Sequence, residues 1–129
     1  MRSMLRKTRS ALIIAAFGLT SASAWAANHT VSVGGAAGLV FTPASLSIAA
    51  GDTVTFTNAG GFHNAVSDPG AVTSFNSGAA SSAAWSITVT FPTPGTVGYH
   101  CTIHGAPGQG MFGTINVTVP VDLQSFGID

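Results

Sequence analysis

The sequence predicts an all-β fold, a β-sandwich or barrel of seven to eight strands, and three observations lead to it. Apolar residues alternate with small polar residues through most of the chain after residue 26, which is the periodicity of half-buried strands. Gly, Pro, Asn and Asp interrupt these runs at short intervals, as turns between strands do. The runs that result are short and regularly spaced, which favours a sandwich.

Residues 1–26 are expected to be a signal peptide rather than part of this domain. All four Lys and Arg residues stand within the first nine positions, and a short apolar run follows at 11–19. That run is too short to span a bilayer, so we expect no stable membrane anchor. Small residues on both sides of Trp25, at 22–24 and 26–27, suit cleavage, and we place the cut after Ala26, with Ala27 as the alternative. Residues 27–129 then form a single periplasmic domain.

Removal of the basic segment leaves a weakly acidic domain. Four aspartates remain, at positions 52, 68, 122 and 129, with no Lys, Arg or Glu. A chain without Lys or Arg cannot neutralise phosphates, which excludes nucleic acid as a partner. Four scattered acids also make only weak electrostatic steering toward a basic partner. We expect the domain to be a monomer.

The strands of the first half follow from the alternation. Residues 29–33 form the first strand, and 39–41 form a short second piece that ends before Pro43, because proline cannot donate to a central ladder. Leu46 and Ile48 alternate before a turn at 50–52, and 54–56 form the next strand. Residues 62–66 are predicted as a further strand, which carries His63.

The second half contains one long loop and three strands. Residues 67–84 are rich in Ser, Ala and Gly, and we expect a loop with at most a helical turn. The remaining strands are 85–91, which begins at Trp85, then 97–101, and 111–119 with Ile115, Val117 and Val119 inward. Strand parity turns Cys101 inward with Val97 and Tyr99, and turns His100 to the opposite face. His100 is therefore not expected to be a ligand.

Soft metal ligands cluster around the single cysteine. Cys101 cannot form an internal disulfide, and an unpaired thiol in an exported protein calls for another role. His104 follows three residues later and Met111 seven residues after that. Thiolate, imidazole and thioether together suit copper, and a trigonal site needs a second imidazole, for which His63 is the obvious donor. Cysteine binds copper as the thiolate and histidine as the neutral imidazole, and low pH protonates both. Copper affinity should therefore fall at low pH.

Several stretches share a wider pattern. They are 41–43, 46–48, 51–56, His63-Asn64, the run 95–101 that leads to the cysteine, and 111–115. Together they resemble the cupredoxin family, the small type 1 (blue) copper proteins of the plastocyanin, pseudoazurin and amicyanin kind. The resemblance covers roughly residues 31–119 and implies a cupredoxin-like Greek-key sandwich.

The resemblance also implies a site and a function. His63, Cys101 and His104 would be equatorial ligands of one type 1 copper per chain, and Met111 the axial ligand. Asn64 would brace the cysteine loop by hydrogen bonding. The implied function is single-electron transfer between redox partners in the periplasm, without enzymatic activity. Partners would dock near His104, on an apolar patch whose expected members are Phe62, Ala106, Pro107, Met111 and Phe112.

Three alternatives stay open at this stage. Six residues separate His104 from Met111, a longer spacing than in the plastocyanin-like loop, and Gln109 stands at the plastocyanin-like spacing as an alternative axial ligand. The function could be periplasmic copper buffering or delivery instead of electron transfer. A mature chain that begins Ala27-Asn28-His29 could also wrap a second Cu(II) in a square plane through its amine, two amides and the imidazole, although an accidental histidine is favoured.

Overall fold

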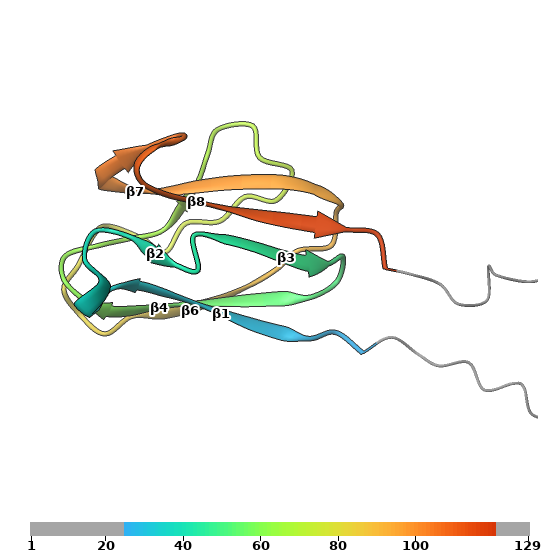
Figure 1. The fold of residues 1–129 in the computed structure, drawn as a ribbon, viewed down its shortest axis with the longest axis horizontal. Helices are drawn as coiled ribbons and strands as arrows, with labels where there is room; N and C mark the ends of the chain where they lie inside the picture. Colours follow the sequence, from blue (N-terminus) through green and yellow to red (C-terminus); the bar gives the residue numbers. More distant parts are fainter. Residues whose placement is uncertain (1–24, 121–129) are drawn as a thin grey trace, which may run out of the picture.

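The computed structural model describes residues 25–120, so the predicted signal peptide lies almost entirely outside the described residues. Eight strands and one short 3₁₀ turn form two layers (Figure 1). The elements are β1 (Asn28–Gly34), η2 (Gly35–Ala37), β2 (Phe41–Thr42), β3 (Ser45–Ala49), β4 (Thr53–Gly60), β5 (Val66–Ser67), β6 (Ser86–Thr90), β7 (Gly95–Ala106) and β8 (Gln109–Thr118). The predicted all-β sandwich is confirmed.

Each layer is a four-stranded sheet. One sheet has the order β2-β1-β4-β6 and the other has the order β3-β8-β7-β5. Both contain one parallel pair, β1 with β4 and β3 with β8, while the other neighbours run antiparallel. The described chain ends lie at one end of the sandwich, and the tip of the β7–β8 hairpin lies at the other (Figure 1). Within residues 25–120, no helix is long and apolar enough to cross a membrane.

The core lies between the sheets and comes from the predicted alternation. In β4, Val54 and Phe56 are buried while their neighbours are partly exposed, and β7 buries Val97, Tyr99 and Cys101 in the same way. Phe41 and Phe56 pack edge-on against Tyr99, with ring centroids 4.7 and 5.1 Å away. Aromatic pairs of this geometry add to area burial. These contacts anchor β7, the strand that carries the cysteine, in the core.

Three details of the predicted strands are wrong. Residues 62–66 do not form one strand, because His63 makes only an isolated bridge to Ser81, and β5 begins at Val66. Val119 is 71% exposed rather than inward, because β8 ends at Thr118. Trp85 precedes β6, and its indole N–H leaves the sheet pattern to donate to the His63 carbonyl at 3.0 Å.

Candidate metal centre

The cysteine and the second histidine lie in a bulge of the long β7–β8 hairpin. The ladder pairs His100 with Phe112 and then resumes only with Gly105 opposite Gly110. Residues 101–104 therefore face a single residue, Met111, on the partner strand. An excess of residues on one strand bends that strand and re-aims its side chains. This bend allows a thiol and an imidazole three residues apart to turn toward one point.

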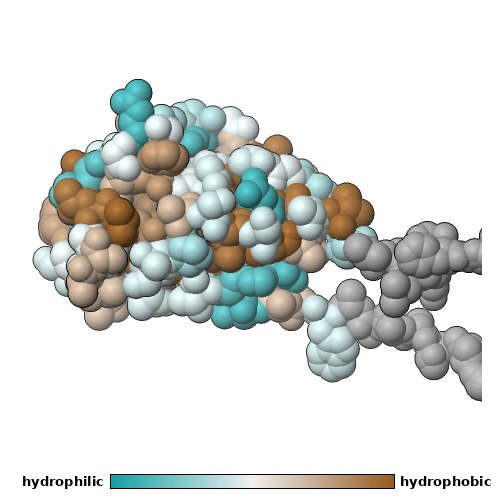
Figure 2. All heavy atoms as spheres, viewed as in Figure 1, coloured by the Kyte–Doolittle hydropathy of each residue, from teal (hydrophilic) through white to brown (hydrophobic). Residues whose placement is uncertain are grey.

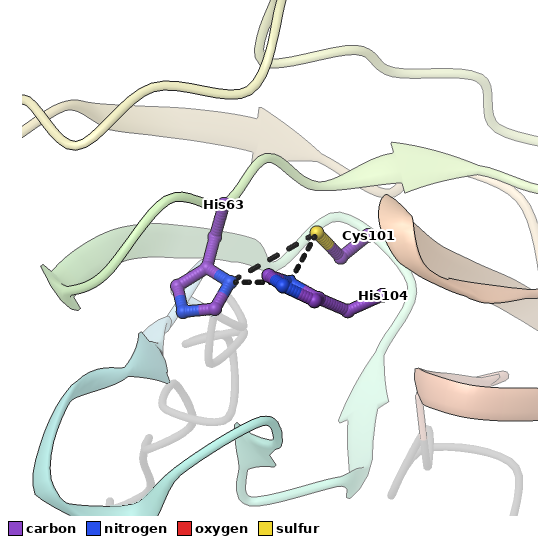
Figure 3. Close-up of side chains that lie close together, drawn as sticks. All are labelled: His63, Cys101 and His104. Carbon is purple, nitrogen blue, oxygen red and sulfur yellow. Dashed lines mark hydrogen bonds between the residues drawn. The ribbon is translucent and has the colours of Figure 1, made fainter.

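Three donor atoms converge beside this bulge (Figure 3). His104 Nδ1 lies 3.2 Å from His63 Nδ1 and 3.7 Å from Cys101 Sγ, and the sulfur lies 4.0 Å from His63 Nδ1. His63 and Cys101 are buried, whereas His104 is partly exposed. Residues far apart in the sequence thus bring two nitrogens and one sulfur into a compact triangle.

The size of this triangle suits a metal ion. Bonds of about 2.0 Å to two nitrogens and about 2.3 Å to a thiolate, in one plane, would separate the nitrogens by about 3.5 Å and each nitrogen from sulfur by about 3.7 Å. The observed separations of 3.2, 3.7 and 4.0 Å agree closely with these values. Two imidazoles and one thiolate form the trigonal donor set of blue copper sites, so the residues present fit copper.

The backbone of His63 is held from two sides. Its N–H donates to the Ser81 carbonyl at 3.2 Å, and its carbonyl accepts from the Ser81 N–H at 3.1 Å. The same carbonyl accepts the Trp85 indole N–H. These contacts replace the strand that the alternation predicted. They fix the direction from which the imidazole enters the site.

The far edge of the His63 ring is enclosed by glycines. A Cβ on Gly34 or Gly61 would lie closer than 3 Å to Nε2, so only glycine leaves room for the ring at these positions. The ring also makes a hydrogen bond with the backbone of Gly60. The ring faces the other two donors through Nδ1.

Burial lowers the pKa of His63 below its usual 6.5, and the nearby charge of His104 lowers it further. The backbone hydrogen bond with Gly60 opposes this shift only partly, because it is the smallest of the three effects. His63 therefore stays neutral at pH values where an exposed histidine takes up a proton. Neutral imidazole is the form that binds a metal.

Asn64 ties the His63 segment to the cysteine bulge. Its carbonyl oxygen accepts the Thr102 N–H at 2.8 Å, and its amide donates to the Gly78 carbonyl at 3.0 Å. A further bond of 3.0 Å joins the amide to the Thr102 hydroxyl. The asparagine is 3% exposed, so these bonds are shielded from water. The bracing contact that the resemblance implied for Asn64 is present.

The two alternative axial residues differ in burial and position. Met111 is 1% exposed and stands opposite the bulge, whereas Gln109 is exposed and pairs with Ala106 near the hairpin tip. The chain reverses at Pro107-Gly108, where a fixed proline φ and the positive φ of Gly108 (69°) favour a tight turn. The six-residue spacing is thus absorbed by a two-residue turn and strand pairs rather than by an open loop.

The other two histidines lie apart from the donor triangle. His100 bonds to Asp68 through its Nδ1 at 2.6 Å, on the face away from Cys101, as strand parity predicted. His29 lies in β1 and bonds through Nε2 to Asp52 at 2.9 Å. Square-planar binding of Cu(II) by Ala27-Asn28-His29 would have to break this bond and the first pairs of the β1–β4 ladder.

Sequence reasoning missed the residues that support the ligands. Neither Gly34 nor Gly61 was singled out, and Trp85 was expected only as a strand residue. Their Gly-Gly and loop contexts indicate turns, but no pattern in one sequence tells which side chain a turn will enclose. The spacing of the donors in the sequence indicated a metal site, whereas the contacts of Gly34, Gly61 and Trp85 with His63 arise only in the tertiary fold.

Comparison with known proteins identifies the family. Residues 27–118 match the family described as copper binding proteins, plastocyanin/azurin family. A plastocyanin of Scenedesmus fuscus is 44% identical over 97 residues, which cover 68% of this chain and 97% of the relative.

Solved structures agree with this match. The oxidised plastocyanin of Dryopteris crassirhizoma aligns with a TM-score of 0.56 at 31% identity, covering 69% of this chain and 99% of that one. A copper-containing nitrite reductase of Thermus scotoductus aligns with a TM-score of 0.57 at 28% identity, over 83% of this chain but only 25% of the enzyme. With a family match over most of its length and a donor triangle suited to a single type 1 copper, this chain belongs to the plastocyanin/azurin family of copper-binding proteins.

Proposed function

We propose that this protein carries single electrons between redox partners in the periplasm through a Cys-His₂-Met copper site. His63, Cys101 and His104 are the proposed equatorial ligands, and their convergence within 4.8 Å is the observation that carries the proposal. Copper held there would supply one-electron chemistry between Cu(I) and Cu(II). The chain's own task is to hold the donors and to leave one edge of the site within reach of partners.

Met111 is the proposed axial ligand. Its place opposite the bulge and its burial support this assignment, whereas the exposure of Gln109 and its pairing near the hairpin tip argue against glutamine. A thioether is a weak axial donor that helps to tune the potential of such a site.

A donor set that is held before the metal arrives favours rapid electron exchange. Ser81 and Trp85 hold the His63 backbone, and Asn64 holds the bulge at Thr102. Second-layer contacts of this kind fix the orientation of ligands. We infer that the donors move little between the two oxidation states, which lowers the barrier to transfer.

His104 is the proposed point of electron entry and exit, because it is the one partly exposed member of the triangle. Exposed apolar residues adjoin the ligands in sequence: Phe62 (53% exposed) beside His63, and Ile103 (49% exposed) beside His104. Figure 2 shows apolar residues at the end of the sandwich away from the chain ends, and others along its body. Met111, expected in this patch, is buried and does not contribute to it.

The charges of the domain suit a transient apolar encounter. The described part of residues 27–129 contains two acids, and both are engaged elsewhere: Asp52 with His29 and Asp68 with His100. A small interface without charge pairs allows fast release. We propose that association with a partner, by a monomer of this protein, depends only weakly on ionic strength.

Two other functions are weighed against this one. Copper buffering or delivery would use the same ligands but needs no fast exchange. The nitrite reductase alignment would support an enzymatic role, but it covers only a quarter of that enzyme. Within residues 25–120 the single cluster of three His, Cys or acidic donors is the one described above. We therefore propose a carrier rather than an enzyme.

The test is electron self-exchange between reduced and oxidised copies of the copper-loaded mature protein, measured by NMR line broadening. Fast exchange supports the carrier, and exchange too slow to broaden the lines supports buffering. Phe62→Ser should slow the exchange. Val72→Ser is the matched control, because Val72 is equally exposed (56%) but lies beside Gly95, at the far end of β7 from His104. Equal effects of the two substitutions would contradict the docking patch.

A further inference from the structure

A second polar cluster lies at the end of the sandwich where the described chain ends lie (Figure 1). Its centre is Asp52, which is 7% exposed, in the turn between β3 and β4. One carboxylate oxygen, Oδ2, accepts from His29 Nε2 at 2.9 Å and from the Ala49 N–H at 3.1 Å. The other, Oδ1, accepts from the backbone nitrogen of Ala27 at 2.9 Å.

A positive partner would stabilise a buried carboxylate of this kind beyond its neutral hydrogen bonds. Removing an ion from water costs several kcal/mol unless an opposite charge or strong hydrogen bonds compensate. Residues 27–129 contain no Lys and no Arg. The groups that can carry positive charge beside Asp52 are therefore His29, when protonated, and the nitrogen of Ala27, if that nitrogen is a free amine.

We propose that proteolytic removal of residues 1–26 supplies this charge: the new α-ammonium group of Ala27 pairs with the Asp52 carboxylate and locks β1 into the sheet. In the cleavage, water adds across the Ala26–Ala27 amide. The carbonyl of Ala26 leaves as a carboxylate, and the nitrogen of Ala27 becomes an amine that is protonated near neutral pH. A neutral N–H donor is thereby replaced by a charged donor at the same place.

The position of Ala27 is fixed independently of this bond. Its carbonyl accepts the Thr53 N–H at 2.9 Å, and the next residue, Asn28, begins the parallel β1–β4 register opposite Thr53. A cut one residue later would remove both the carbonyl and the amine from this place. A mature chain that begins at Ala27 keeps both contacts, whereas one that begins at Asn28 loses them.

This pairing also competes with the second copper site considered for the N-terminus. The square-planar chelate needs the Ala27 amine, two deprotonated amides and the His29 imidazole around one ion. In the structure the Ala27 nitrogen and the His29 ring both bond to Asp52, and β1 is extended along β4. The two arrangements exclude one another, so the folded mature protein is expected to bind one copper.

The test compares three mature proteins, which begin with free Ala27, with N-acetylated Ala27, or with Asn28. Acetylation keeps the N–H donor and removes only the charge, so it is the matched control. Free Ala27 should melt about 4–8 °C above the acetylated form, because charge-assisted bonds are roughly twice as strong as neutral ones. In Asp52→Asn that difference should vanish. Equal melting temperatures of the two forms with Asp52 present, or an undiminished difference in Asp52→Asn, would overturn the proposal.

Two further measurements do not depend on the folding of a variant. Protein exported with its own leader should have the intact mass of a chain that begins at Ala27, and any other start overturns the proposal. The α-amine, followed by NMR, should titrate above the usual range of roughly 7.7–8.0. His29 and Asp52 are the titratable groups bonded in this cluster, and an amine that titrates within or below that range contradicts the pairing.

Discussion

Replacing Gly34 by alanine tests whether the glycines beside His63 position that ligand. An added Cβ at residue 34 would lie 2.5 Å from the Gly60 carbonyl oxygen and from His63 Cδ2, and closer still to Nε2. Backbone atoms of β4 cannot move aside easily, so the overlap must be relieved by a shift of the imidazole. The proposed copper ligand would then leave its observed position relative to Cys101 and His104.

A matched control, Gly38→Ala, separates the free-energy cost of backbone strain from the cost of the steric overlap. Gly34 has φ 67° and ψ −132°, and Gly38 has φ 92° and ψ −147°, a region that favours glycine in both cases. Alanine at either position should cost about 1–3 kcal/mol of backbone strain. Nothing lies within 4 Å of a Cβ on Gly38, whereas overpacking at Gly34 should add about 1–3 kcal/mol.

The assays are urea unfolding of the metal-free proteins and copper binding by competition with a chelator. Gly34→Ala should lose more unfolding free energy than Gly38→Ala, and the difference should equal the overpacking cost of about 1–3 kcal/mol. If copper binding must move the shifted His63 ring back against the same overlap, copper affinity should fall by about 5- to 150-fold in Gly34→Ala. It should remain unchanged in Gly38→Ala. Equal unfolding free energies and equal copper affinities in the two variants would refute the positioning role.

Four other outcomes are expected. Asn64→Ala should lower the free energy of unfolding by about 1–3 kcal/mol, because a buried N–H of the bulge loses its acceptor; a loss below 0.5 kcal/mol in urea melts contradicts this. Met111→Leu should keep the blue colour and raise the potential in a redox titration, while Gln109→Ala changes neither; the reverse pattern assigns the axial role to glutamine. Tyr99→Phe should leave thermal stability unchanged or higher, because no group within residues 25–120 bonds to its buried hydroxyl, and a clear loss would show that the hydroxyl has a partner. Metal-free protein should lose stability as the pH falls through 6.5, because the lowered pKa of His63 makes the unfolded chain the better proton acceptor, and His63→Gln should reduce this loss.

The fold was predictable from local alternation, and the closeness of His63, Cys101 and His104 was predictable from residue type, spacing and the family resemblance. Alternation placed Val97, Tyr99 and Cys101 on one face, and the structure buries all three. Parity likewise separated His100 from the site. The cysteine, histidine and methionine spacing pointed to a metal because few other arrangements need those side chains together.

The remaining details depend on contacts that no local pattern carries. The run at 62–66 alternates like a strand, but His63 lies in an isolated bridge because the loop residue Ser81 supplies its partner. Val119 continues the alternation of β8, yet the sheet ends one residue earlier. The role of Gly34 was hidden for the same reason, since the side chain that it accommodates lies on a segment nearly thirty residues away.

The visible spectrum of the Cu(II)-loaded mature protein tests the central claim most directly. If Cys101, His63 and His104 bind one copper together, the solution is intensely blue from thiolate-to-copper charge transfer, and Cys101→Ser is colourless. A pale solution from the folded, copper-saturated protein, or a blue colour that persists in Cys101→Ser, would contradict the site on which the proposed electron transfer depends.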